Sequence, residues 1–136
     1  MNPLIAGIDL GTTAMKIAIF DTKGKIQGNA TIEYQLYTPQ SYFVESDPTI
    51  YMAAIEKGFK QLEEQGVNLN EVTAIGFSLQ SETMFFVDGN CNPLRNSISW
   101  MDNRAVKQSE YLTQKYGNEL CYKHTGQVSW GANWPI

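Results

Sequence analysis

The stretch GIDLGTTAMK near the start of the chain gathers chemically useful side chains at one tight turn. Asp9 ends an apolar run, Gly11 allows a sharp turn and a close approach by a ligand, and Lys16 opens the next run. Thr12 and Thr13 add hydroxyl groups and N–H donors. N–H groups, hydroxyls and a lysine suit a polyphosphate, and a nearby carboxylate suits Mg²⁺ held through water.

The same residues also fit a plain hairpin turn. Gly and Thr are common in turns, and the Asp9 carboxylate can accept hydrogen bonds from neighbouring backbone N–H groups. We expect Asp9 to end a buried strand, where a carboxylate is costly unless it is paired, hydrogen-bonded or near a metal. A Walker loop does not fit, because a strand rather than a helix follows and Lys16 lacks the preceding glycine of that motif.

Three short strands are predicted to position this turn. Residues 4–10 and 15–21 are short, mostly apolar runs, typical of strands covered on both faces. Residues 25–33 alternate between apolar or small and polar side chains, which is typical of a half-exposed strand near a sheet edge. Because the connecting turns are short, the three strands should be antiparallel neighbours.

A helix is predicted next, with Asp47 as its N-cap, Pro48 at its first position and Gly66 just past its end. Its predicted core stripe follows spacings of three and four: Met52, Ile55, Phe59 and Leu62.

Further strands are predicted at 72–78, 83–88 and 96–102, with a turn at 88–90 between the second and third. A second helix is predicted over 103–116, ending at Gly117, and its predicted core residues are Ala105, Leu112 and Tyr116. This order predicts an α/β domain, a mixed sheet that begins with three antiparallel strands and is covered by helices.

Composition narrows the class of protein. The chain has 136 residues, 43% of them hydrophobic, which suits one globular domain with a core. The net charge of -4 argues against nucleic acid as a partner. No run reaches the ~18 apolar residues of a membrane span, and the start lacks the layout of a signal peptide. Because the chain has neither feature, we expect no membrane partner. Two cysteines make no disulfide framework, which agrees with an expected cytoplasmic location.

The segment GIDLGTTAMK resembles the first phosphate segment of the superfamily that includes actin, sugar kinases and heat-shock chaperone ATPases. This resemblance implies a ribonuclease H-like (actin-like ATPase) fold with two lobes around a nucleotide cleft. It also implies that Gly11, Thr12, Thr13 and Lys16 surround the phosphates of ATP and that Asp9 holds Mg²⁺.

Residues 75–104 resemble the FGGY carbohydrate kinases more specifically. The matching features, in order, are Ser78 and Gln80, then Val87 and Asp88, then Pro93 and Leu94, and finally Trp100, Asp102 and Arg104. VESDP before the first helix and HTGQ at 124–127 also match, so the resemblance spans nearly the whole chain. It implies that Gln80, Glu82, Asp102 and Arg104 bind a sugar or polyol.

These four residues are chemically suited to a polyol, which offers many hydroxyls and no charge and is recognised by buried donors and acceptors beside an apolar wall. Trp100 or Phe85 would supply that wall. QSET is close to the glycerol-kinase branch, but Ser81 stands where that branch has Arg, and Glu82 stands where the xylulose-kinase branch has His. The sequence therefore leaves the substrate open.

Each of these residues has a plainer interpretation. Glu82 is also typical of a solvent-exposed residue at the start of a strand. Asp102 is also typical of a helix N-cap, and Arg104 could form a surface ion pair with Asp102. Trp100 suits the core, as do Met84, Phe85 and Phe86, and His124 suits a structural or surface position.

The resemblance implies ATP-dependent phosphorylation of a sugar or polyol hydroxyl, with a general-base Asp expected beyond Ile136. We therefore expect residues 1–136 to be the N-terminal part of the first FGGY lobe, inactive alone and without the second lobe. Apolar surface left uncovered would favour a homo-oligomer. The alternatives are a chaperone- or actin-type ATPase and a non-catalytic sugar-binding module with the kinase fold.

Overall fold

The computed structural model describes residues 3–131 of the chain. The chain divides into two compact units, Met1–Gln35 with Pro48–Gln80 and Leu36–Asp47 with Ser81–Ile136.

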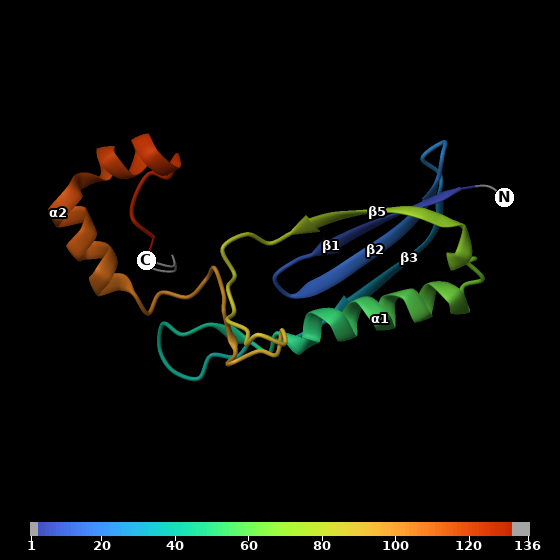
Figure 1. The fold of residues 1–136 in the computed structure, drawn as a ribbon, viewed down its shortest axis with the longest axis horizontal. Helices are drawn as coiled ribbons and strands as arrows, with labels where there is room; N and C mark the ends of the chain where they lie inside the picture. The colour runs from blue at the N-terminus through green and yellow to red at the C-terminus, as the bar shows by residue number, and fades with distance from the viewer. Residues whose placement is uncertain (1–2, 132–136) are drawn as a thin grey trace. The chain divides into compact units, whose positions relative to one another are not determined.

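The first unit is a four-stranded mixed sheet with a helix on one face. Its strands are β1 (Leu4–Leu10), β2 (Ala14–Asp21), β3 (Ile26–Glu33) and β5 (Val72–Leu79), in the order β3-β2-β1-β5. β2 runs antiparallel to both β1 and β3, which confirms the predicted start. β5 is parallel to β1 and is reached through the helix α1 (Thr49–Glu64) and the short 3₁₀ helix η1 (Leu69–Glu71), as a parallel neighbour requires. Figure 1 shows α1 running alongside these strands.

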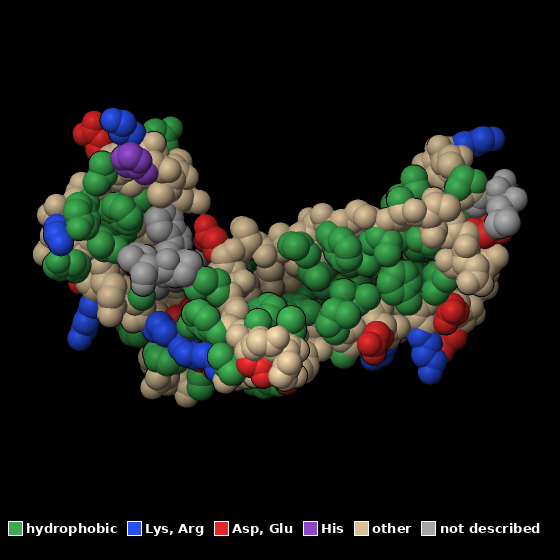
Figure 2. Space-filling model, in the orientation of Figure 1, with side chains coloured by type: hydrophobic (Ala, Val, Ile, Leu, Met, Phe, Trp, Pro, Cys, Tyr) green, Lys and Arg blue, Asp and Glu red, His purple; other side chains and the backbone are tan. Residues whose placement is uncertain are grey.

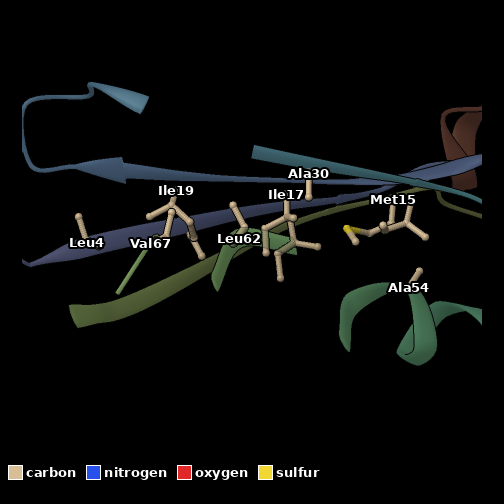
Figure 3. Packing of buried hydrophobic residues seen from close by; sticks show 11 residues of the cluster. Leu4, Met15, Ile17, Ile19, Ala30, Ala54, Leu62 and Val67 are labelled. Atoms are coloured by element: carbon tan, nitrogen blue, oxygen red, sulfur yellow. The ribbon is translucent and has the colours of Figure 1, made fainter. Parts of the chain in front are cut away.

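The core of this unit lies between α1 and one face of the sheet. Ile17, Ile19 and Met15 of β2 are almost completely buried there, opposite Ala54 and Leu62 of α1 (Figure 3). Burying side chains of this size stabilises the fold by roughly 1.5–3 kcal/mol each.

Two glycines let elements of this unit come close together. A Cβ at Gly58 would lie 2.5 Å from Cε of Met15, and one at Gly28 would lie 2.6 Å from Cγ2 of Val67. Glycine at these two positions therefore allows the helix, and the chain that follows it, to pack tightly on β2 and β3.

Two details of this unit differ from the prediction. The buried line of α1 is Ala54, Gly58 and Leu62, with Ile55 and Phe59 beside it, whereas Met52 is 62% exposed. The prediction considered only large apolar residues, whereas the helix also packs through the small residues Ala54 and Gly58. The helix begins at Thr49 with Pro48 at its cap position, one residue later than the prediction, which placed the cap at Asp47 and Pro48 inside the helix. Gly66 follows the end of the helix as predicted, with φ 86°.

β1 was expected to be covered on both faces, and it is not. Its burial alternates, with Ala6 and Ile8 buried toward α1 and Ile5 exposed on the other face. Among the described residues, α1 packs on β2 and β3, and β5 keeps Ile75, Phe77 and Leu79 exposed at the sheet edge. Figure 2 shows hydrophobic side chains gathered over the region of β5 and α1.

The second unit has little regular sheet. β4 (Glu45–Ser46) and β6 (Ser97–Ile98) form a two-stranded antiparallel pair. The predicted strand at 83–88 is wrong: this segment makes single bridges at Met84 and Val87, and Phe85 and Phe86 are exposed rather than in a core. The predicted strand at 96–102 shortens to β6. The predicted turn at 88–90 is confirmed, since the Asp88 carbonyl accepts the Cys91 N–H.

The helix α2 (Val106–Thr125) breaks at Gly117, where φ is 72° and ψ is 160°. Gly117 therefore interrupts the helix as predicted, but the helix then resumes to Thr125. Tyr116 was predicted to face a core, and it is exposed. The indole N–H of Trp130 donates to the Gly117 carbonyl, so the segment after the helix folds back onto the break.

Candidate functional site

The turn between β1 and β2 lies where two parallel strands end side by side. β1 and β5 are parallel and in register up to Leu10 and Leu79, and the Gln80 N–H donates to the Leu10 carbonyl at 2.9 Å. Ligands of sheets with parallel strands bind beyond the carboxyl ends of such strands. The turn residues Gly11, Thr12 and Thr13 therefore occupy a favoured position for a site.

Gly11 closes this turn. Its N–H donates to the Ala14 carbonyl at 3.0 Å, and a Cβ on Gly11 would lie only 3.0 Å from that same oxygen. Glycine is therefore needed here for a close backbone approach rather than for an unusual φ.

A row of polar side chains crosses the sheet face opposite α1. Asp9 pairs in register with Lys16 of β2 and with Ser78 of β5, and Thr31 of β3 follows beyond Lys16. In-register neighbours present their side chains on the same face. The four residues border a hollow of about 690 Å³, whose lining also includes the apolar Ile5, Ala18 and Phe20.

Asp9 and Lys16 are exposed, which corrects the expectation that Asp9 is a buried carboxylate. The reason is the one-sided packing of β1, because Asp9 lies on the face that α1 does not cover. The ion pairs among the described residues involve neither Asp9 nor Lys16. A negative and a positive group thus stand side by side at the turn, both accessible to a ligand.

Two tyrosines that the sequence analysis did not single out lie behind the turn. The Tyr34 hydroxyl donates to the Gly11 carbonyl at 2.5 Å, and the Tyr34 N–H donates to the Thr13 carbonyl at 3.0 Å. Burial, with smaller contributions from Tyr51 and Asp9, raises the pKa of Tyr34 to about 12. The Tyr34 and Tyr51 rings meet edge to face, 5.5 Å apart. One signal was available, since Tyr34 continues the alternation of β3 two residues after the buried Ile32.

Gln80 joins this group from the end of β5. Its side-chain N–H₂ donates to the Tyr51 hydroxyl at 3.1 Å. Its side-chain oxygen is buried and has no hydrogen-bond partner among the described residues. A buried acceptor without a donor costs about 1–3 kcal/mol, so a ligand hydroxyl that reaches it would be favoured. Gln80 thus fits the predicted role of binding a polyol.

In the second unit, Asp102 and Arg104 form a buried ion pair. Arg104 donates from Nε to Oδ1 of Asp102 at 2.8 Å and from Nη2 to Oδ2 at 2.7 Å, and also from Nη2 to Glu45 at 2.7 Å. The guanidinium carbon lies 3.8 Å from the centre of the Phe43 ring, and the Val44 N–H donates to Asp102. The predicted N-cap role of Asp102 is not seen, since α2 has Ala105 at its cap.

The electrostatics of this network favour its charged form. Burial alone would raise the pKa of the Asp102 carboxyl, but hydrogen bonds and charge from Arg104, with the Val44 N–H, hold that pKa below its ordinary value. For Glu45, burial is likewise outweighed by Arg104, Asn96 and Arg95, and its pKa is lowered. Hydrogen bonding to Asp102 raises the pKa of Arg104. Asp102 and Arg104 are therefore held by protein groups, including the buried Glu45, which the sequence analysis did not select.

Glu82 and Trp100 are accessible. Glu82 is exposed and adopts φ 63°, a left-handed conformation unusual for a residue with a side chain, and it accepts a bond from Gln127 at 3.4 Å. Trp100 is 44% exposed, which overturns its expected place in the core. The strained backbone conformation of Glu82 is of a kind that often marks a functional position. His124 is exposed near the end of α2, as expected.

The described residues contain no cluster of three or more metal-binding side chains. A Mg²⁺ ion accompanying a nucleotide keeps several waters and uses few protein carboxylates. Asp9, exposed beside Lys16 at the turn, fits that kind of ion, so its chemistry agrees with the predicted metal role.

A sequence profile of the FGGY family of carbohydrate kinases, N-terminal domain, matches residues 4–133 of the chain. The chain belongs to this family. It is 32% identical over 128 residues to a glycerol kinase of Rhizobium meliloti (strain 1021), covering 93% of this chain and 26% of that protein. It is 35% identical over 124 residues to a xylulose kinase of Staphylococcus epidermidis, covering 90% of this chain and 25% of that protein.

Solved FGGY kinases share the fold. A gluconate kinase from Lactobacillus acidophilus matches with a TM-score of 0.85 at 26% identity, over 95% of this chain and 26% of that one. A xylulose kinase from the same species matches with a TM-score of 0.84. The fold is thus the actin-like ATPase fold of the FGGY kinases, as predicted, and the chain spans about a quarter of the length of these relatives. No helix among residues 3–131 is long and apolar enough to cross a membrane.

Proposed function

We propose that the chain forms the N-terminal part of the first lobe of a kinase that transfers phosphate from ATP to a hydroxyl of a sugar or polyol. The observation that carries this proposal is that Asp9 and Lys16 lie opposite each other on neighbouring strands beside the Gly11–Thr13 turn, in a chain of the FGGY family. The relatives named above are glycerol, xylulose and gluconate kinases, which supports the class of acceptor and leaves its identity open.

In this proposal the turn holds the nucleotide phosphates. The backbone around Gly11, Thr12 and Thr13 and the Lys16 ammonium surround them, and Asp9 holds Mg²⁺ through water. The bound ion neutralises negative charge on the phosphates. Catalysis then depends on positioning and charge neutralisation, with a general-base Asp expected beyond Ile136.

The acceptor is assigned to Gln80, Glu82, Asp102 and Arg104, with Trp100 as an apolar face. The partnerless oxygen of Gln80 and the exposed carboxylate of Glu82 are the groups we expect to contact hydroxyls. The Asp102 oxygens are already shared with Arg104 and Val44, so we expect Asp102 to act mainly by holding Arg104 in place.

ATP consumption by the complete gene product, screened across sugars and polyols, tests this function. Turnover that requires one acceptor supports the kinase. Acceptor-independent hydrolysis would instead indicate a chaperone- or actin-type ATPase. Absence of nucleotide binding would contradict both and leave a sugar-binding module. We further propose a cytoplasmic location and little activity for residues 1–136 alone.

We also propose that copies of this chain self-associate. Ile75, Phe77 and Leu79 are exposed on β5, which ends the sheet in the described part of the chain, and an apolar sheet edge favours pairing with a second chain. Sedimentation velocity should show an oligomer that Phe77→Asp weakens. A monomer at all concentrations would contradict this proposal.

A further inference from the structure

We propose that Tyr34 is a positioning residue for the phosphate turn, and that Tyr51 extends its effect to Gln80, so that nucleotide binding and acceptor binding are coupled. The coupling rests on the proposed kinase function. The positioning of the turn does not, and it can be measured without any ligand.

Tyr34 holds the turn at two points. Its hydroxyl donates to the Gly11 carbonyl at 2.5 Å, and its N–H donates to the Thr13 carbonyl at 3.0 Å. A trans peptide unit is planar, and its C=O and N–H point in opposite directions. Fixing the Gly11 carbonyl toward Tyr34 therefore directs the N–H of Thr12 away from it. Tyr34 thus sets the direction of a backbone donor in the middle of the proposed phosphate turn.

The Tyr34 hydroxyl is suited to this task because it stays a donor. Its ring packs against the core of the first unit and meets Tyr51 edge to face, at an interplanar angle of 83°. A tyrosine hydroxyl keeps its proton throughout the neutral range, and burial raises the pKa of Tyr34 further, to about 12. Substituting Phe for Tyr34 would remove this hydrogen bond while leaving a ring of the same shape in place.

Gln80 is fixed to the same assembly at two points. Its backbone N–H donates to Leu10, the residue before Gly11, and its side-chain N–H₂ donates to the Tyr51 hydroxyl. Its buried oxygen has no partner among the described residues. An acceptor hydroxyl that bonded this oxygen would immobilise the Gln80 amide against Tyr51. Because Tyr51 packs on Tyr34, ordering at Gln80 would lower the cost of ordering the turn.

The first test compares Tyr34→Phe with Tyr37→Phe in the complete gene product. Tyr37 is a suitable control because it is half exposed and its backbone N–H and carbonyl pair with those of Glu45. In Tyr34→Phe, the turn should open more easily once the bond to the Gly11 carbonyl is lost, so the Gly11 N–H, which is bonded to the Ala14 carbonyl, should exchange its hydrogen about tenfold faster. The amide of Leu62 in α1 should be unchanged, which would show that the fold is kept. Unchanged exchange at Gly11 would overturn the positioning role.

The second test measures the affinity for a non-hydrolysable ATP analogue with Mg²⁺ by calorimetry, without and with the acceptor found in the screen, so that no phosphate is transferred during the titration. In the wild type the acceptor should tighten ATP binding at least about fivefold, the lower end of usual coupling. In Tyr51→Phe this factor should fall toward one, whereas in Tyr37→Phe it should persist. The proposed coupling through Tyr51 would be overturned if the acceptor tightened ATP binding equally in the wild type and Tyr51→Phe, or did not tighten it in the wild type. A wild type that binds no ATP would contradict the kinase function instead, and the exchange result would still decide the role of Tyr34.

Discussion

The Arg104 guanidinium binds the Asp102 carboxylate at two points, Nε to Oδ1 at 2.8 Å and Nη2 to Oδ2 at 2.7 Å, and Asp102 is completely buried. The Val44 N–H also donates to Asp102, and Glu45 accepts from Arg104. The bonds from Val44 to Asp102 and from Arg104 to Glu45 therefore tie the segment around β4 to the segment before α2. The first role of this network is to hold the second unit together.

Asp102→Asn should destabilise the second unit by about 3 kcal/mol, the lower end for a broken buried pair, because Arg104 loses its completely buried carboxylate and keeps only Glu45. The three tryptophans of residues 1–136 all lie after residue 99, so tryptophan fluorescence during chemical denaturation of this chain reports on the second unit. Arg95→Gln is the control, since Arg95 is more exposed and surface pairs contribute less than about 1 kcal/mol. Equal effects of the two substitutions would contradict the assignment.

The same network predicts sensitivity to acid. The pKa values of Asp102 and Glu45 are lowered in the folded chain, so the unfolded chain takes up protons first as the pH falls. The stability they contribute is therefore complete above about pH 5 and is lost as the pH falls through their lowered pKa values. Fluorescence-monitored denaturation should show this loss in the wild type and a smaller one in Asp102→Asn. Identical acid profiles would argue against the network.

Gly11→Ala should weaken ATP binding, on the order of tenfold or more, because the new Cβ would lie 3.0 Å from the Ala14 carbonyl and distort the turn. Calorimetric titration of ATP with Mg²⁺ measures this. Gly89→Ala is a matched control, since nothing lies within 4 Å of a Cβ there. If both variants bind ATP as the wild type does, the turn does not hold the phosphates.

Glu82 allows backbone strain to be separated from side-chain chemistry. Glu82→Gly should relieve the cost of φ 63°, roughly 1 kcal/mol, while removing the carboxylate. Glu82→Gln keeps the backbone cost and removes the charge. Both should raise the KM of the acceptor, and only the glycine variant should be more stable. A KM unchanged in both variants would exclude Glu82 from the acceptor site.

The order of the elements in the first unit could be predicted because its strands and helix carry clear local signals. The alternation of β3 and the apolar runs of β1, β2 and β5 correspond to real strands. The face of β1 that stays open could not be predicted, because it depends on which strands α1 covers. The predicted site role of Asp9 therefore rested in part on a burial that the structure does not show.

The second unit was harder to predict, because long-range polar bonds rather than periodic burial hold it. Phe85 and Phe86 look like core residues in the sequence, yet they are exposed, while the charged Glu45 and Asp102 are buried. Their burial depends on Arg104, which is 59 residues from Glu45 along the chain. Tyr34 likewise meets Gly11 across 23 residues, a contact that local pattern does not reveal.

The central claim is that Asp9 and its turn serve phosphoryl transfer to a sugar or polyol. The most direct test measures acceptor-dependent ATP turnover by the complete gene product, wild type against Asp9→Asn, together with binding of the acceptor alone. The account predicts that kcat falls by a factor on the order of 10²–10³ while acceptor affinity stays within about twofold. An Asp9→Asn variant that keeps the wild-type kcat would contradict it.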